Sequence, residues 1–343
     1  LFVAFICYPV MLAEIAMGRR TQRNPVGAFS MLSDHSKVWR LTGMLGIVTP
    51  FMIAVFYTVI TVWLVVYLKQ LATGNLDILS SDATFSNLVQ EPSLFGYASL
   101  LLAAVFLILV GGVKGGIERL ARVLMPALAV MLVVLVCFVL TLDNASAGIA
   151  YYLVPDFSKM DLGVVNGALS QAFFSLSLGM GILITYGSYF SRTDSIPSSA
   201  RMVATMDTSI AFFAGLLILP AIFAFDPNTN TDDLSTSSVG LIFSFLPKIF
   251  LSMQAAVGYF GASVVAFIFF LLVFFAALTS LVSIIEIPIS YWIDEWKMTR
   301  KRAVLTQAFL LALFAIPATL SFGLSEFFTN FTNYGGLSKS FFD

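Results

Sequence analysis

The chain has 343 residues, of which 59% are apolar and 11% are charged, and its net charge is −1. Soluble proteins carry about 25% charged residues, so this composition excludes a soluble globular protein and predicts an integral membrane protein. Both cysteines lie in apolar segments, which excludes a disulfide framework and a paired thiol metal site.

Eight apolar segments are long enough to cross a bilayer, which takes about 20 residues. They cover residues 1–17, 43–68, 97–113, 121–142, 164–190, 200–225, 260–292 and 303–323. Basic residues gather in or beside the loops after residues 17, 113, 190 and 292, and acidic residues dominate the other loops. By the positive-inside rule these four loops are cytoplasmic. The first segment begins inside an apolar run, and we expect a fragment of a longer protein.

The connection over residues 226–258 is long and contains the apolar run VGLIFSFLPKIFLSMQ. Long loops in compact proteins are commonly functional or partly structured. We expect short helices in this extracellular loop, forming either a lid over the outer face or a surface hairpin.

The fifth segment contains QAFFSLSLGMGILITYGSYF, with small or polar residues at every second position near its centre. These are Ser175, Ser177, Gly179 and Gly181. One interpretation is a helix broken into halves near 164–174 and 181–190, because glycine leaves helical dihedrals without steric penalty. The facing half-helix ends would offer carbonyl groups to a cation and N–H groups to an anion. The alternative is a packing seam of two overlapping small-xxx-small pairs.

Three acids, Glu14, Asp207 and Glu286, lie within the apolar segments. Charges there cost a few kcal/mol and commonly mark ions, partners or proton paths. Each also has a simpler explanation. Glu14 is near a cytoplasmic end and can extend towards water, Asp207 can be interfacial, and Glu286 can make a hydrogen bond between helices.

The seventh segment, FFAALTSLVSIIEIP, places Ala276, Thr279 and Ser280 on one helix face. Two hydroxyls and a carbonyl suit a hard cation that prefers oxygen ligands. Alternatively, the hydroxyls bond back to carbonyls four residues earlier in the helix. In the second segment Ile53 and Tyr57 also share a face, where a tyrosine is more often a packing residue than a ligand.

Several other chemistries are excluded. The only histidine, His35, lies in a charged loop, so a Ser/His protease is unsupported. The sequence has no glycine-rich phosphate loop, no His/Cys cluster with metal spacing and no basic-aromatic pattern for nucleic acid.

Five stretches, taken in order and with their spacing, resemble the sodium-coupled amino-acid and neurotransmitter symporters, the neurotransmitter:sodium symporter family. They are PVMLAEIAMGRRTQRNPVGAF, GGVKGGIERLARVLMP, YYLVPDFSKM, QAFFSLSLGMGILITYGSY and FFAALTS. The resemblance covers nearly the whole chain. It implies an all-α, LeuT-type inverted-repeat fold over residues 1–343, a single transmembrane domain that holds the family's second to ninth helices. It also implies a multi-pass protein of the plasma membrane, here the bacterial inner membrane.

The resemblance implies two sodium sites. The first takes Ser175 and Asp207, and the second takes the Ala276 carbonyl with the Thr279 and Ser280 hydroxyls. Many relatives have asparagine where this chain has Asp207. A fixed carboxylate there supplies the negative charge that chloride supplies in chloride-dependent relatives, so we expect no chloride requirement.

The resemblance also implies a substrate pocket without an unpaired charge, which favours an apolar or aromatic amino acid. Its residues are Ile53, Tyr57, Phe174, Ser175, Ser177, Met180, Ser280 and Ile284. Within it Tyr57 would bind the substrate carboxylate, and Phe174 would cap the site from outside.

Further roles follow from the matched positions. The supports of the broken helix would be Glu14, Gln171, Gly179 and Gly181, the cytoplasmic gate would use Ser188, Tyr189 and Asp294, and Gly116 with Pro126 would form a helix-unwinding motif.

The sequence therefore predicts a sodium-coupled importer of an amino acid that works by alternating access, and not an enzyme. Its partners are Na⁺, the amino acid and the lipid bilayer, without nucleic acid; the oligomeric state is not predicted. Three alternatives stay open. One is a transporter of the same fold for another amine or osmolyte, or with another coupling ion. The others are a channel or receptor-like bundle, and a fragment without activity because it lacks the family's first helix.

Overall fold

The computed structural model describes residues 1–111, 117–225, 238–334 and 337–341. Within them six helices are long and apolar enough to cross a membrane. They are α3 (Lys37–Ala72), α6 (Leu94–Gly111), α7 (Ile117–Val139), α11 (Ile196–Phe225), α13 (Gln254–Asp294) and α14 (Arg300–Leu320). The all-α membrane fold expected from the sequence is confirmed.

The other two expected spans consist of shorter helices. The first is a π-helical turn, η1 (Val3–Cys7), that continues into α1 (Tyr8–Thr21). The fifth is divided into α9 (Leu162–Ser175) and α10 (Ile182–Gly187). Each piece is shorter than the length of about 20 residues that spans a bilayer, so only the joined pieces reach across.

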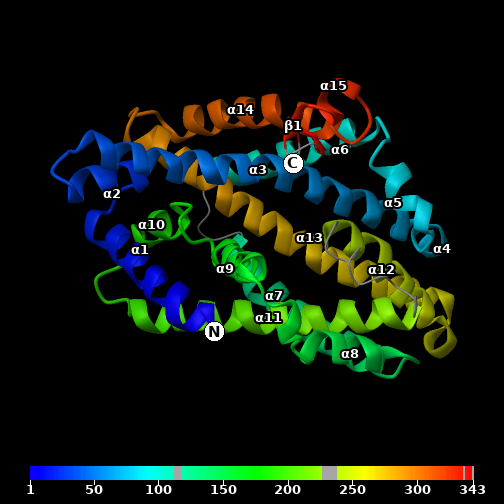
Figure 1. The fold of residues 1–343 in the computed structure, drawn as a ribbon. Coiled ribbons are helices and arrows are strands. Elements are labelled where there is room, and N and C mark those ends of the chain that lie inside the picture. Colours follow the sequence, from blue (N-terminus) through cyan, green and yellow to red (C-terminus); the bar gives the residue numbers. More distant parts are fainter. Residues whose placement is uncertain (112–116, 226–237, 335–336, 342–343) are drawn as a thin grey trace.

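The remaining elements are short and lie between the long helices. They are α2 (Pro25–Leu32), α4 (Leu76–Leu79), α5 (Asp82–Leu88), α8 (Ala145–Leu153), η2 (Phe157–Lys159), α12 (Ser238–Ser252), α15 (Glu326–Thr329), β1 (Thr332–Tyr334) and β2 (Leu337–Lys339). The two strands pair antiparallel, with Thr332 opposite Lys339. Helix α2 lies at one end of the molecule and α4, α5 and α12 at the other (Figure 1).

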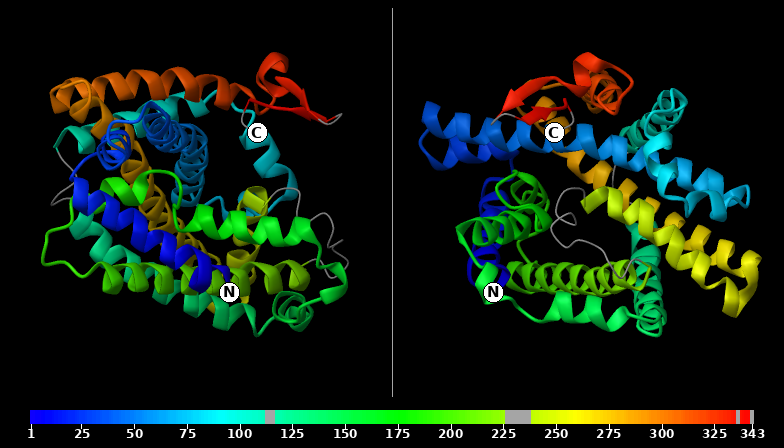
Figure 2. Two further views of the ribbon diagram at one scale, coloured as in Figure 1. Left: turned by 60° about the vertical axis from the view of Figure 1, so that its left-hand side comes forward. Right: turned by 45° about the vertical axis from the view of Figure 1, so that its right-hand side comes forward.

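The buried apolar side chains form two main cores. The larger core joins chiefly α3, α6, α7, α12, α13 and α14. The smaller core joins α1, the connection between α9 and α10, and the first half of α11 through Cys7, Met11, Ile15, Leu176, Leu178, Ile196, Ala200 and Ala204. A bridging cluster, Val26, Ile47, Ile182 and Ile287, combines residues of α2, α3, α10 and α13. In both views of Figure 2, α14 lies towards the top and α11 towards the bottom.

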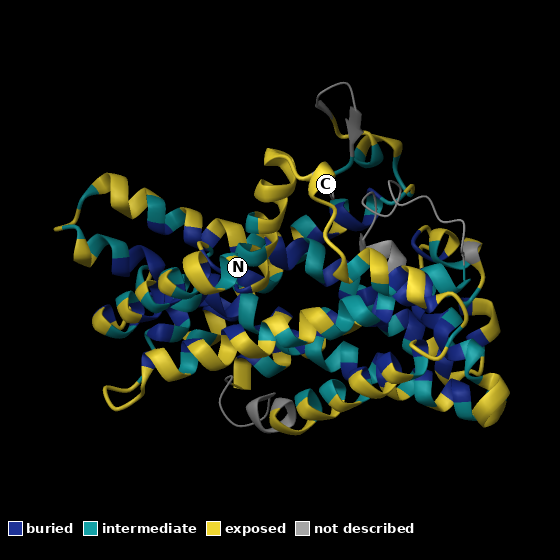
Figure 3. Cartoon of the chain, turned by 60° about the horizontal axis from the view of Figure 1, so that its bottom comes forward, coloured by how far each residue is buried: buried dark blue, intermediate teal, exposed yellow. Residues whose placement is uncertain are grey.

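The outer faces of the helices are apolar as well. Leu107 on α6, Val130 on α7 and Met202 on α11 are each at least 65% exposed. Figure 3 shows exposed residues along the outer sides of the helices. Such a surface is matched by lipid, since exposed apolar residues of this density suit a bilayer rather than water. The chain is therefore a multi-pass membrane protein.

An aromatic cluster fixes α12, which lies within the expected loop over 226–258. The indole of Trp63 on α3 makes edge contacts with Phe85, Phe243 and Phe322, at ring-centroid distances of 5.2, 5.8 and 5.0 Å. The Tyr67 hydroxyl donates to the Phe243 carbonyl at 3.0 Å. Helix α12 is thus attached to α3 rather than standing free.

Candidate functional site

The site is organised by the break between α9 and α10. Three residues of this connection have positive φ: Ser177 at 57°, Gly179 at 73° and Gly181 at 71°. A residue with a Cβ loses about 1–2 kcal/mol in this left-handed region, whereas glycine adopts it without a steric penalty. The backbone is therefore unstrained at Gly179 and Gly181 and strained at Ser177. The broken helix is confirmed, and a continuous helix with a packing seam is wrong.

Glu14 on α1 stabilises the freed backbone. Its Oε1 accepts a hydrogen bond from the Gly179 N–H at 2.8 Å. The residue is 9% exposed, so it does not extend into water as one interpretation suggested. Its other oxygen, Oε2, is buried and has no hydrogen-bond partner within the described part of the chain. Gln171, expected to act beside Glu14, is exposed and makes no hydrogen bond to any described residue.

Helices α1 and α10 pack backbone to backbone. A Cβ on Gly187 would lie 2.5 Å from the Ile15 carbonyl oxygen, and one on Gly18 would collide with the Ile184 carbonyl. Only glycine fits at both positions. This close approach holds α10 in place although α10 itself is a single short helix.

The residues expected at the first sodium site lie together. The Ser175 hydroxyl lies 2.9 Å from Oδ1 and 2.8 Å from Oδ2 of Asp207. Ser175 is the last residue of α9, where the helix dipole favours a cation. Within the part of the chain that the structure describes, no group of three or more His, Cys, Asp or Glu side chains gathers at one place. A cation bound here would therefore take hydroxyl and carbonyl oxygens together with the one carboxylate.

The three residues expected at the second sodium site occupy one turn of α13. The Thr279 hydroxyl donates to the Ala276 carbonyl at 2.9 Å, so its hydroxyl does bond back along the helix, three residues earlier rather than four. Both oxygens of this pair are hard ligands of the kind that Na⁺ prefers. Ser280, next in the chain, lines the adjacent cavity.

A cavity of about 170 Å³ lies beside the break. All eight expected substrate residues line it, and Ile182 is the ninth: Ile53, Tyr57, Phe174, Ser175, Ser177, Met180, Ile182, Ser280 and Ile284. The polar side chains that line it carry hydroxyls, and none of its side chains is charged. Ile182 was not predicted from the sequence, although its place directly after the glycine that opens α10 was the available signal.

The three expected gate residues are not hydrogen-bonded to one another. Ser188 donates to the Thr185 carbonyl at 2.6 Å, and Tyr189 is half exposed. Asp294 accepts instead from the backbone and side chain of Asn24. Of the expected unwinding motif, Pro126 lies inside α7 and Gly116 lies outside the described residues.

The buried carboxylate of Glu286 forms an ion pair with Arg300, whose side chain is partly exposed. This partner was not predicted from the sequence. Its two carboxylate oxygens accept from the guanidinium of Arg300 at 2.9 and 3.0 Å, and Arg300 Nε donates to the Leu109 carbonyl at 2.9 Å. The pair joins α13 to the start of α14 and the end of α6. The simpler explanation of Glu286, a hydrogen bond between helices, is thus confirmed, and its donor is a charged guanidinium.

Comparison with known proteins settles the family. The model of the Sodium:neurotransmitter symporter family matches residues 92–338. The chain belongs to this family. Its members are sodium-coupled transporters and not enzymes, in line with what the sequence predicts.

Individual relatives agree. The chain is 35% identical to an uncharacterized sodium-dependent transporter, YhdH, of Bacillus subtilis, covering 94% of this chain and 70% of the relative. It is 34% identical to an uncharacterized sodium-dependent transporter of Haemophilus influenzae, covering 98% and 72%. The crystal structure of MhsT in complex with L-phenylalanine superimposes with a TM-score of 0.87 at 38% identity, covering 98% of this chain and 74% of MhsT. The LeuT-type fold is thereby confirmed.

Proposed function

We propose that the protein imports an apolar or aromatic amino acid together with Na⁺ by alternating access. The observation that carries this proposal is the uncharged cavity beside the broken helix, bounded by residues of α3, α9, α10 and α13. In it the hydroxyl of Tyr57 binds the carboxylate of the amino acid. The side chain of the substrate lies against Ile53, Met180, Ile182 and Ile284.

The size of the cavity supports a single small substrate. Pockets for drug-sized ligands have volumes of about 300–1,000 Å³, and this cavity has about 170 Å³. A lysine or glutamate side chain would place an uncompensated charge against apolar walls, which costs several kcal/mol. The complex of MhsT with L-phenylalanine shows that a protein of this fold, 38% identical to the chain, binds such a substrate.

Two sodium ions are assigned within the same proposal. One is bound by Ser175 and Asp207, and the other by the Ala276 carbonyl with the Thr279 and Ser280 hydroxyls. Because Asp207 carries a fixed negative charge close to the first ion, transport does not require chloride. The loops after residues 17, 113, 190 and 292 face the cytoplasm, as their basic residues favour.

The test is uptake of radiolabelled amino acids by the purified protein in proteoliposomes, under an inward Na⁺ gradient or a matched choline gradient. Leucine, phenylalanine and tryptophan should accumulate only with Na⁺, and lysine and glutamate should neither accumulate nor compete. Competition by amines or osmolytes but not by amino acids would indicate a transporter of another substrate. Sodium-dependent flux without accumulation against a gradient would indicate a channel.

A further inference from the structure

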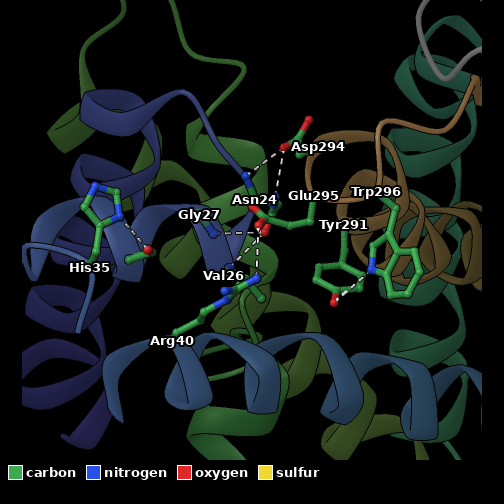
Figure 4. Close-up of polar contacts among 10 residues, drawn as sticks. Asn24, Val26, Gly27, His35, Arg40, Tyr291, Asp294, Glu295 and Trp296 are labelled. Carbon is green, nitrogen blue, oxygen red and sulfur yellow. Dashed lines mark hydrogen bonds and ion pairs between the residues drawn. The ribbon is translucent and has the colours of Figure 1, made fainter. Parts of the chain in front are cut away.

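Asn24 is a buried polar residue between α1 and α2, at the end of the molecule opposite α12. It is 2% exposed although it follows the charged sequence Gly-Arg-Arg-Thr-Gln-Arg. Figure 4 shows its side chain between the first turn of α2 and the carboxylates at the end of α13. A buried amide is retained at such a position only when its polar atoms are used.

The side chain of Asn24 uses both of its polar ends. Its Oδ1 caps α2 by accepting from the N–H groups of Val26 and Gly27 at 2.9 and 3.2 Å. Its Nδ2 donates to Asp294 Oδ2 at 3.1 Å and to Glu295 Oε1 at 3.3 Å. Its backbone N–H donates to the same Asp294 oxygen at 3.1 Å. One residue thus joins the start of α2 to the end of α13.

The residues after Asn24 are wedged between α3 and α10. A Cβ on Gly181, the residue that opens α10, would lie 2.6 Å from Pro25 Cγ. On the α3 side, a Cβ on Gly43 would lie 2.6 Å from Val26 Cα and 2.9 Å from the Pro25 carbonyl oxygen. A shift of this short segment must therefore displace either α3 or α10, the second half of the broken helix.

This segment also lies at the junction of the two cores. The smaller core contains α1 and the first half of α11, and the larger core contains α3 and α13. The bridging cluster that connects them contains Val26, two residues after Asn24, and Ile182, the first residue of α10. A movement of one core relative to the other would therefore strain the hydrogen bonds between Asn24 and Asp294.

We propose that Asn24 is a positioning residue that latches the end of α13 to α2 and α10, and that transport requires this latch to open and close. The latch holds the conformation in which Ser175 and Asp207 lie together, because α10 and α13 also carry the wall of the cavity. The inference rests on the proposed function for its transport readout, but its structural readout is independent of the substrate.

The informative variant is Asn24→Asp. Aspartate caps a helix as well as asparagine does, so α2 keeps its N-cap. The variant loses the Nδ2 donor and places a carboxylate against Asp294 and Glu295. The matched control is Arg40→Gln, which removes only the exposed ion pair between Arg40 and Glu295 at 3.8 Å. Should Asn24→Asp fail to fold, Asn24→Ser keeps a capping oxygen and removes the same donor.

The first readout is the labelling rate of a Ser290→Cys thiol by a maleimide in the purified, Cys137→Ser protein. Ser290 is 7% exposed and lies one turn before Asp294. Asn24→Asp should raise the labelling rate by about tenfold, as a shift of about 1.4 kcal/mol in a two-state equilibrium does. Saturating Na⁺ should reverse the increase, because Na⁺ binds the conformation that assembles Ser175 with Asp207. Arg40→Gln should label at the parent rate.

The second readout is uptake. Asn24→Asp should raise the sodium concentration for half-maximal uptake and leave the rate at saturating Na⁺ near that of the parent, whereas a merely misfolded protein loses rate at every concentration. The double variant Asn24→Asp/Asp294→Asn, which exchanges donor and acceptor, should restore slow labelling. Unchanged labelling in folded Asn24→Asp, or equal effects of Arg40→Gln, would overturn the latch. A parent protein that does not take up amino acids would overturn the proposed function and leave the labelling result to decide on the latch.

Discussion

The hydroxyl of Ser175 lies within 2.9 Å of both carboxylate oxygens of Asp207, across the space between the end of α9 and α11. This arrangement gathers oxygen atoms around one fixed negative charge beside the cavity. We expect Asp207→Asn to raise the Na⁺ concentration for half-maximal uptake by about tenfold, or about 1.4 kcal/mol, because an oxygen ligand stays but its charge is lost. Uptake should also become dependent on chloride. Sodium titrations in chloride and gluconate media measure both effects.

The control for this prediction is Ser209→Ala on the same helix. The Ser209 hydroxyl donates to the Thr205 carbonyl within α11 at 2.8 Å and takes no part in the proposed site. Its removal should leave the sodium titration unchanged. An Asp207→Asn protein with parent sodium affinity and no chloride effect would remove Asp207 from the site.

Thr279→Val tests the second sodium site. Valine keeps the shape of threonine and removes the hydroxyl that now donates to the Ala276 carbonyl. We expect the Na⁺ concentration for half-maximal uptake to rise by several fold, about 1 kcal/mol, since one oxygen ligand is lost. Thr319→Val removes a comparable buried hydroxyl, bonded to the Ala315 carbonyl at 2.8 Å on α14, and should not change the titration.

Tyr57→Phe tests the substrate contact. Removal of the phenol oxygen should raise the KM for the amino acid by about tenfold, in line with a lost hydrogen bond to a charged group of about 1.5–3 kcal/mol. Tyr67→Phe on the same helix removes a hydroxyl that binds the Phe243 carbonyl. It should reduce thermal stability and leave the KM unchanged. Equal KM values for Tyr57→Phe and the parent protein would place the carboxylate elsewhere.

Two alanine variants separate backbone strain from steric fit at the break. Gly179 has a φ of 73°, and a Cβ at this position would have open space around it, so Gly179→Ala should cost only the strain of about 1–2 kcal/mol. Gly181 has nearly the same φ, but its Cβ would collide with the Gly46 carbonyl and Pro25. Gly181→Ala should therefore lower the Tm clearly more than Gly179→Ala. Equal Tm values for the two variants would show that the Pro25 ring moves aside at little cost in free energy.

The ion pair of Glu286 and Arg300 makes a prediction about stability. Arg300→Ala leaves a buried carboxylate unpaired and should reduce the free energy of unfolding by about 3–5 kcal/mol. The double variant Glu286→Leu/Arg300→Met removes both charges and should recover part of that loss. Thermal unfolding in detergent compares the three proteins, and a double variant less stable than Arg300→Ala would contradict the prediction.

The membrane-spanning helices and the broken helix could be predicted from the sequence because both depend on local composition. A run of apolar residues indicates a span wherever it occurs, and serine and glycine at alternate positions near Gly179 indicate a departure from helix within that run. The eight expected cavity residues came from the family resemblance, which places distant motifs together. Residue spacing alone grouped only neighbours on one helix, such as Ile53 with Tyr57.

The contacts that were not predicted depend on the tertiary structure rather than on the local sequence pattern. Asn24 and Asp294 are separated by 270 positions, and nothing in the local pattern around either residue points to the other. The pair of Glu286 and Arg300 is close in sequence, but the turn that brings them together begins after α13 ends. The short hairpin of β1 and β2 was missed because three-residue strands have too little alternation to be detected.

The close contact of Gly18 and Gly187 with the facing backbones determines which substitutions this protein tolerates near the break. A helix as short as α10 is not stable in isolation, because the formation of its first turn is unfavourable, so its order comes from packing against α1. In the connection before α10, Ser177 and Met180 line the cavity and can be exchanged without touching this contact, whereas any side chain at Gly18 or Gly187 would displace α10 from α1.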